Sequence, residues 1–216
     1  PLTARSAPLK RPFLFTPVPE ELDPFDFKTF YANPTAFWLV ATDVETGEAV
    51  YRQATEGMHI DELCEWIRAS SSMPIVSQWV EIKEQKLLDG GLADAIPLRF
   101  FNEQGYERNV VILTQPRGYI KQPNALMPLM RLVYYRHPHF VQTIAQRHEM
   151  YNAQLRYVEA QEKAGKAFVI APEAKLPIRH ITHDRQRMQR TYDIGRAQAL
   201  ALLPQLKAFL ENETTR

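Results

Sequence analysis

The sequence predicts an α/β fold built on a mainly parallel sheet. Three segments each contain a continuous rather than alternating apolar run, which is typical of strands buried on both faces: residues 37–41, 109–114 and 167–171. Helical patterns separate the runs, and this strand–helix–strand order favours parallel pairing, because parallel strands need a long crossover connection. At 216 residues the chain is long enough for one sizeable domain, and we expect one.

Proline content separates a leading arm from the folded part of the chain. Six prolines lie within residues 1–24. Proline lacks a backbone N–H and fixes φ, so neither a helix nor a central strand continues through such a segment. We therefore predict a proline-rich arm over residues 1–24 and one folded domain over residues 25–212.

The first half of the predicted domain holds a hairpin and a helix. Turn-forming residues at 42–48 separate the first apolar run from a short strand-like segment at 49–51, which predicts two adjacent strands. Asp61 is expected to cap a helix over residues 62–70, because apolar residues recur there at helical spacing.

The remaining elements follow from apolar spacing and from glycine or proline at their ends. They are short strands within 79–88, a helix from Pro97 to about Gln104 that stops at Gly105, a helix over 138–163 closed by Gly165, and a helical tail over 184–211 interrupted near 193–195.

Composition and charge narrow the class of protein. The net charge is +1, which gives no overall attraction for nucleic acid. Cys64 is the only cysteine, so an intrachain disulfide is impossible and a reducing, cytoplasmic location is expected. No apolar run is long enough to span a bilayer, and no glycine-rich phosphate loop follows a strand, which argues against a nucleotide-binding module.

One turn stands out as a place for chemistry. Asp89 ends a short apolar run and precedes Gly90 and Gly91. An Asp-Gly pair is most often a structural turn. In this chain, however, a second acid, Asp94, and a helix-starting proline, Pro97, follow it. A carboxylate at a strand end of an α/β sheet is well placed to orient or deprotonate a nucleophile.

Two segments near this turn form a recognisable pair of motifs: residues 69–74 read Ala-Ser-Ser-Ser-Met-Pro, and residues 89–97 hold Asp-Gly-Gly followed by Asp and Pro. In these segments the chain resembles the bacterial patatin-like phospholipases. Both match the family in order and spacing, as does the segment 33–47, and the resemblance runs from about residue 24 to 210. It implies a three-layer α/β/α patatin-like fold, of which this chain is the C-terminal portion.

The resemblance also implies an activity and a site. In that family a serine in a Gly-x-Ser-x-Gly turn attacks an acyl ester, and the aspartate of the Asp-Gly-Gly motif is its only side-chain partner. The implied catalytic residue is therefore Asp89, with Gly90 and Gly91 as its supporting motif, and neither a metal nor an organic cofactor is implied. The substrate class would be a lipid or another acyl ester.

The chain departs from the family pattern at the nucleophile. No pair of its eight glycines brackets a serine at the required spacing, and no glycine-rich segment offers an oxyanion hole. We expect the N-terminal part of the domain to be missing and the 216-residue chain to be inactive. The alternative is a non-catalytic binding or interaction protein that retains part of the patatin fold.

For three other features we favour a structural interpretation over a catalytic or binding role. Ser70–Ser72 at a helix end satisfy local backbone groups rather than act as nucleophiles. The pairs His137 with His139 and His180 with His183 lack further ligands at metal spacing. The basic tail is a solvated helix face or, as a sharper alternative, a peripheral contact with an anionic membrane surface. Its residues are Arg179, His180, Arg185, Arg187, Arg190 and Arg196.

A missing part of the domain would have a structural consequence. The sheet would end where strands should continue, leaving an unpaired edge and exposed apolar surface. We therefore expect the isolated chain to self-associate through that edge.

Overall fold

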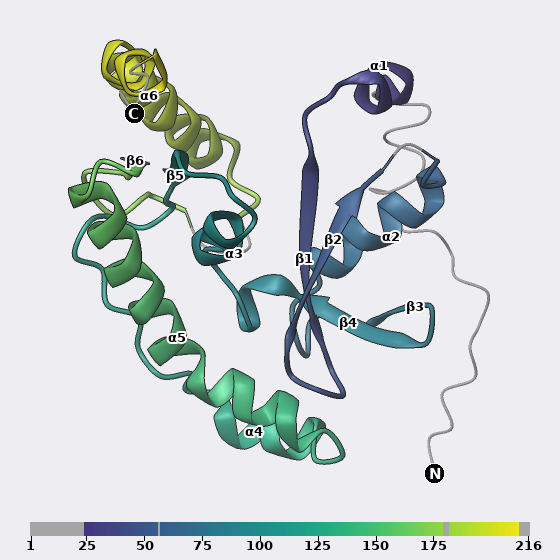
Figure 1. Cartoon of the computed structure of the whole chain (residues 1–216). Helices are drawn as coiled ribbons and strands as arrows, with labels where there is room; N and C mark the ends of the chain where they lie inside the picture. Colours follow the sequence, from purple (N-terminus) through teal and green to yellow (C-terminus); the bar gives the residue numbers. More distant parts are fainter. Residues whose placement is uncertain (1–23, 56, 179–181, 212–216) are drawn as a thin grey trace. The chain divides into compact units, whose positions relative to one another are not determined.

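A computed structural model describes residues 24–55, 57–178 and 182–211 (Figure 1). The chain divides into two compact units. Unit 1 comprises the described residues within Pro1–Ala95 and Pro123–Arg147, and unit 2 comprises those within Ile96–Gln122 and His148–Arg216. The predicted arm over residues 1–24 lies almost wholly outside the described residues, and the domain boundaries at 25 and 212 stay predictions.

Unit 1 contains a four-stranded sheet in the order β2-β1-β4-β3. Its strands are β1 (Phe37–Asp43), β2 (Ala49–Ala54), β3 (Val80–Ile82) and β4 (Gln85–Asp89). Every neighbouring pair in this sheet is antiparallel. The predicted hairpin over residues 37–51 is confirmed, and so are two short strands within 79–88.

Local turn geometry explains the antiparallel pairing. Lys83 and Glu84 join β3 to β4, and both have positive φ, 47° and 70°. Two such residues in succession are characteristic of the tight hairpin turn that suits twisted strands. Between β1 and β2, Gly47 also has positive φ, and the Asp43 side chain accepts hydrogen bonds from the next turn's amides. The prediction of a mainly parallel sheet is therefore wrong for the described strands.

The helices of unit 1 bury two apolar clusters. They are α1 (Phe27–Ala32), α2 (Ile60–Ser70), the short 3₁₀ helix η3 (Gly90–Leu92), α4 (Met127–Val133) and the first part of α5 (Pro138–Lys163). In β4, Leu87 packs into the cluster that includes α2, and Leu88 packs into the cluster that includes α4 and α5. Both faces of β4 are therefore covered. The three-layer order of the whole domain stays a prediction.

Two helix predictions can be compared in detail with the structure. The bounds of α5 agree with the predicted helix over 138–163, and Gly165 has the positive φ of a helix-ending glycine. The start of α2 differs from the prediction. His59 is the N-cap, and its Nδ1 accepts a hydrogen bond from the backbone N–H of Asp61 at 3.3 Å. Asp61 thus lies inside the first turn, where its negative charge interacts favourably with the helix dipole.

Unit 2 contains α3 (Leu98–Glu103), the parallel pair β5 (Asn109–Ile112) and β6 (Ala167–Ile170), the rest of α5, and α6 (Arg185–Glu211). The strand–helix–strand pattern therefore predicted a parallel pair correctly in this unit. The prediction that β5 is buried on both faces is wrong. Val111 is buried against Val158 and Val169, whereas Ile112, the next residue along the strand and therefore on its opposite face, is 74% exposed.

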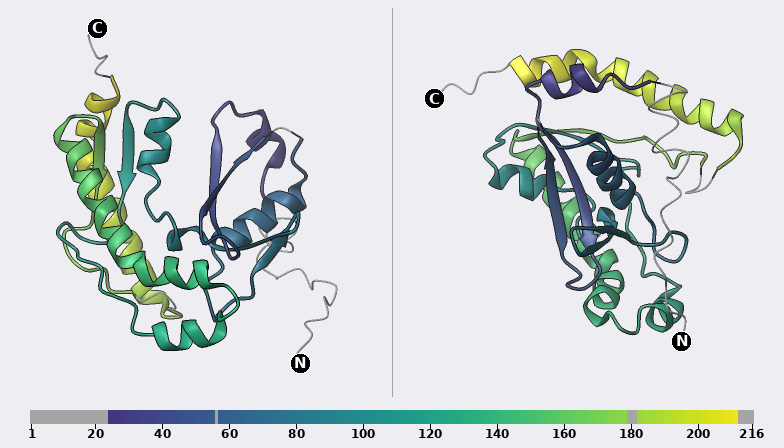
Figure 2. Two further views of the ribbon diagram at one scale, coloured as in Figure 1. Left: turned by 60° about the horizontal axis from the view of Figure 1, so that its bottom comes forward. Right: turned by 90° about the vertical axis from the view of Figure 1, so that its right-hand side faces the viewer.

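The tail forms one continuous helix rather than an interrupted one (Figure 2). The predicted break at residues 193–195 is wrong, because Gly195 has no positive φ and lies within α6. A glycine inside a helix costs only about 1 kcal/mol relative to alanine, which a long helix tolerates. None of the side chains of α6 is buried.

Candidate active site at the end of β4

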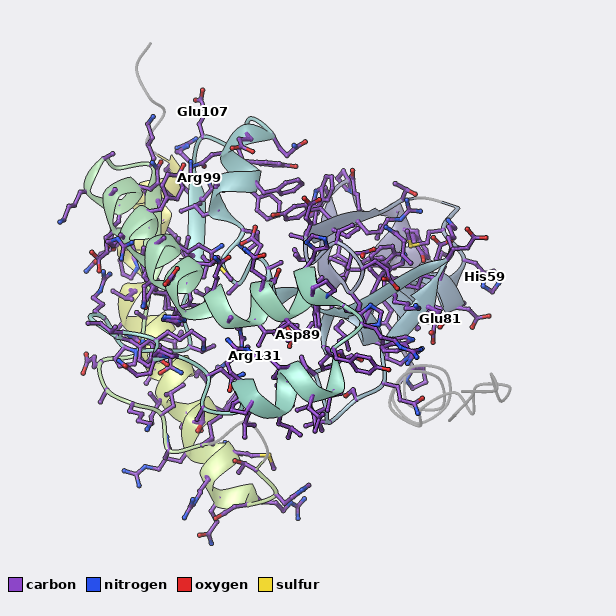
Figure 3. All side chains as sticks on the ribbon, turned by 90° about the horizontal axis from the view of Figure 1, so that it is seen from below. His59, Glu81, Asp89, Arg99, Glu107 and Arg131 are labelled. Atoms are coloured by element: carbon purple, nitrogen blue, oxygen red, sulfur yellow. The ribbon has the colours of Figure 1, made fainter. Side chains whose placement is uncertain are left out.

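The predicted carboxylate lies where β4 ends and η3 begins. Asp89 is the last residue of β4 and the N-cap of η3, and its Oδ1 accepts a hydrogen bond of 2.7 Å from the backbone N–H of Gly91. Asp89 is labelled in Figure 3. A capping carboxylate of this kind is held in one orientation by the hydrogen bond that it accepts from the backbone amide. One oxygen atom of Asp89 is therefore fixed by the turn itself.

Two neighbouring segments fix the backbone of Asp89. Its N–H donates to the carbonyl of Ser72 at 2.9 Å, and its carbonyl accepts from the Thr42 hydroxyl at 2.8 Å. The Thr42 Oγ1 also accepts from the N–H of Ala93 at 3.2 Å. Thr42 is wholly buried and Ser72 nearly so. The turn is thus tied to β1 on one side and to the end of α2 on the other.

Gly90 and Gly91 are required for close approach rather than for unusual torsion angles. A Cβ placed on Gly90 would lie 2.2 Å from the Val40 carbonyl oxygen, closer than side-chain carbons come to backbone. A Cβ on Gly91 would lie 3.1 Å from Asp89 Oδ1. Neither glycine has positive φ. The motif therefore lets η3 pass directly over β1 and lets the Asp89 side chain fold back over the turn.

An arginine that the sequence did not predict completes the turn. Arg147, on α5, donates from Nε to the Gly91 carbonyl at 2.7 Å. Its Nη2 would be 3.6 Å from a Cβ at Gly91, the same point that Asp89 Oδ1 approaches. A guanidinium group and a carboxylate are therefore both close to the position that a side chain at Gly91 would occupy. Their separation in sequence is large, and no local pattern indicates their proximity.

The second acid of the motif has a different role. Asp94 accepts a short hydrogen bond from the Tyr51 hydroxyl through Oδ2, and its backbone N–H donates to the Gly90 carbonyl at 2.9 Å. By contrast, no group in the described part of the chain donates to Oδ2 of Asp89. Asp89 therefore keeps one oxygen atom to which no described group donates, as a base that accepts a proton from a nucleophile requires.

The serines at the end of α2 make the hydrogen bonds to nearby backbone groups that a structural role predicts. Ser72 donates from Oγ to the Arg68 carbonyl at 2.8 Å, and Ser71 donates to the carbonyls of Ile67 and Arg68 at 3.0 and 3.2 Å. These hydroxyls satisfy the last carbonyls of the helix. This arrangement favours a structural role for Ser71 and Ser72.

The histidines in the described part of the chain do not group with other potential metal ligands. His137 Nδ1 lies 3.1 Å from a Glu45 carboxylate oxygen, whose partner oxygen accepts from Lys86 at 2.7 Å. The hydrogen bond from Lys86 is the main cause of a lowered Glu45 pKa. Across the described residues, no group of three histidines, cysteines or acids has a metal-binding arrangement, and His180 lies outside them.

The basic tail is largely exposed. Arg187 forms an ion pair of 3.2 Å with Asp184, and the other described arginines of the predicted set lie on the surface of α6. Arg179 and His180 fall outside the described residues. Within the described ranges, no helix is both long and apolar enough to cross a membrane. Contact of this tail with a membrane stays a prediction.

The geometry thus defines a carboxylate-bearing turn in an α/β unit, held by β1, α2 and α5. Residues 7–101 match the family described as patatin-like phospholipase. The predicted resemblance is confirmed for this part of the chain, which includes the whole Asp-Gly-Gly turn. Residues 137–211 match a different family, a domain of unknown function (DUF6363). No curated protein matches the chain.

The matched family is named after a class of activity, that of a phospholipase. A patatin-like phospholipase region indicates a hydrolase that acts on acyl lipids, at the level of the family. The matched range contains β1 to β4, η3 and part of α3. Arg147 lies outside the patatin-like range, within the range of the second family.

Proposed function

We propose that this chain carries the acidic half of a lipid acyl hydrolase, with Asp89 as the base or orienting partner of a nucleophilic serine. A serine hydroxyl is a weak nucleophile until a neighbouring base takes its proton. The observation that carries the proposal is the open Oδ2 of Asp89, beside an Oδ1 fixed by Gly91. Such a carboxylate has one oxygen atom to set its orientation and one to receive the proton.

The serine and the oxyanion hole would come from a segment outside these 216 residues. The sequence contains no Gly-x-Ser-x-Gly turn. The exposed Val110 and Ile112 on β5 are consistent with a neighbouring segment that covers them in a longer protein. Self-association through an exposed edge, such as that of β5, is the corresponding expectation for the isolated chain.

Turnover of a chromogenic acyl ester tests this proposal in two forms of the protein. The 216-residue chain should show none, because removing a nucleophile leaves only weak residual catalysis. A longer reading frame that adds a Gly-x-Ser-x-Gly segment should hydrolyse the ester. Turnover by the 216-residue chain that survives repurification and disappears in Asp89→Asn would contradict the proposal.

A non-catalytic binding protein is the second candidate. It would keep the turn for its structure, since Thr42, Ser72 and Arg147 all bond to it. A start codon directly before Pro1 in the genomic DNA supports this candidate, whereas an in-frame serine motif upstream supports the enzyme. Lipid binding without hydrolysis by the full reading frame would decide for the binding protein.

A further inference from the structure

Helix α4 is apolar on two faces, one packed in the core of unit 1 and one exposed. Met130 and Tyr134 are buried in the cluster with Phe140 and Ile144. Four apolar residues at the spacing of one helix face lie outside that core: Leu126, Leu129, Leu132 and Val133. Leu132 is 72% exposed. Among the described helices and strands of unit 1, none exposes more large aliphatic side chains than α4.

A loop anchored to α4 extends this apolar surface. The Tyr134 hydroxyl accepts a hydrogen bond of 3.1 Å from the backbone N–H of Ile75. Ile75 and Val76 are both exposed, Val76 by 66%. Ile75 has a φ of 70°, which is strained for a β-branched residue and persists only where contacts enforce it. The backbone therefore holds two aliphatic side chains outward beside the end of α4.

The charged residues within the two segments that form this surface are all basic. The segment 123–147 contains Arg131, Arg136 and Arg147 but no aspartate or glutamate, and residues 69–80 carry no charge at all. Arg131 is exposed and labelled in Figure 3, and the Arg136 guanidinium lies 5.4 Å from the centre of the exposed Tyr135 ring. The nearby acid Glu45 is paired with Lys86. Exposed aliphatic and aromatic side chains beside exposed arginines complement an anionic bilayer surface.

We propose that the exposed faces of α4 and of the loop at residues 75–76 form a surface that docks on anionic phospholipid membranes. This surface is distinct from the basic tail on α6. It borders the candidate site, because Ser72, three residues before Ile75, accepts the hydrogen bond from the backbone N–H of Asp89. Docking at this surface places the Asp89 turn next to the lipid.

Sedimentation with vesicles tests the surface in the full 216-residue chain. The chain should sediment with vesicles of phosphatidylcholine and phosphatidylglycerol and bind pure phosphatidylcholine more weakly. Leu129→Ser with Leu132→Ser should lower the partition coefficient on the mixed vesicles about tenfold or more, because the buried aliphatic area is lost. Arg131→Gln and Arg136→Gln should each lower it about fivefold on the mixed vesicles and little on pure phosphatidylcholine.

Matched changes on α6 serve as controls. Leu200 and Leu203 are also exposed leucines, and Arg187 and Arg190 are exposed arginines. Leu200→Ser with Leu203→Ser, and Arg187→Gln with Arg190→Gln, should leave the partition coefficient within about twofold of the unmodified chain. All these side chains are solvent-exposed, so circular dichroism should show a folded protein in every case.

Several results would overturn the proposal. One is the absence of vesicle binding by the unmodified chain, and another is binding that depends on the α6 residues alone. A third is a dimer in analytical ultracentrifugation that Leu129→Ser with Leu132→Ser converts to a monomer, since a second copy would then cover this face. Vesicle binding needs no turnover, so these outcomes are separate from those that test the acyl hydrolase.

Discussion

The two units differ in how completely the faces of their strands are buried. In unit 1, neighbouring residues of β4 point to opposite faces, and Leu87 and Leu88 are both fully buried. In unit 2, β5 buries Val111 but leaves Ile112 exposed. The difference shows that the chain itself covers both faces of β4 but only one face of β5. The Asp89 turn belongs to the well-covered sheet, whereas the open strand face belongs to the other unit.

The largest expected effect comes from the tightest contact in unit 1. Gly90→Ala would place a Cβ 2.2 Å from the Val40 carbonyl. Because backbone rather than a flexible side chain is in the way, we expect a loss of about 3 kcal/mol in the free energy of unfolding. Urea titration followed by circular dichroism measures this loss. A change below about 1 kcal/mol would show that η3 and β1 can move apart.

Truncating one aliphatic side chain in each sheet is the next comparison. Leu88→Ala should destabilise the chain by about 3 kcal/mol, as expected for a buried leucine. Ile112→Ala should change the free energy of unfolding by less than about 0.5 kcal/mol, because the side chain is exposed. Equal losses at both positions would mean that the open face of β5 is covered, for example by self-association.

A glycine-to-alanine substitution in unit 2 should raise the free energy of unfolding, whereas the one in unit 1 should lower it. Gly195 lies inside α6, and a Cβ there would meet no atom within 4 Å. Gly195→Ala should therefore raise stability by up to about 1 kcal/mol through helix propensity alone. Thermal unfolding by calorimetry would detect this increase. A decrease would indicate that α6 needs a break at this residue.

The smallest effect concerns pH and the Glu45 pair in unit 1. The hydrogen bond from Lys86 lowers the Glu45 pKa below its ordinary value of 4.5. Ionised Glu45 therefore adds stability above pH 4.5, and this contribution is lost as the pH falls through the lower pKa of the folded state. The group is exposed, so the contribution should be only a few tenths of a kcal/mol. In Glu45→Gln, the free energy of unfolding should fall by that amount less as the pH is lowered through the acid range. An unchanged pH dependence in this variant would contradict the pairing.

Local sequence signals predicted the elements better than their pairing. Pro138 and Gly165 mark the ends of α5 because both residues have fixed local geometry. Apolar runs do not encode strand direction, so the antiparallel pairing of unit 1 was predicted only for the hairpin of β1 and β2. The turn between β3 and β4, Lys83-Glu84, has positive φ without the usual glycine or asparagine.

The candidate site was predicted in part for the same reason. Asp89, Gly90 and Gly91 are adjacent in sequence, and their turn chemistry can be read locally. Thr42 and Arg147 reach the turn from 47 residues away and from α5, respectively. Contacts across such separations depend on tertiary packing, which no single-sequence pattern shows. The exposed face of α4 likewise became visible only once its partners in the core were known.

The most direct test of the proposed role of Asp89 is a comparison of two carboxylates in the longer reading frame. Asp89→Asn should lower kcat for an acyl ester about a thousandfold or more, because the nucleophile loses its base. Asp94→Asn, whose side chain is already bonded to Tyr51, should keep kcat within about tenfold of the unmodified enzyme. Equal losses in the two variants, or full activity in Asp89→Asn, would contradict the assignment of Asp89.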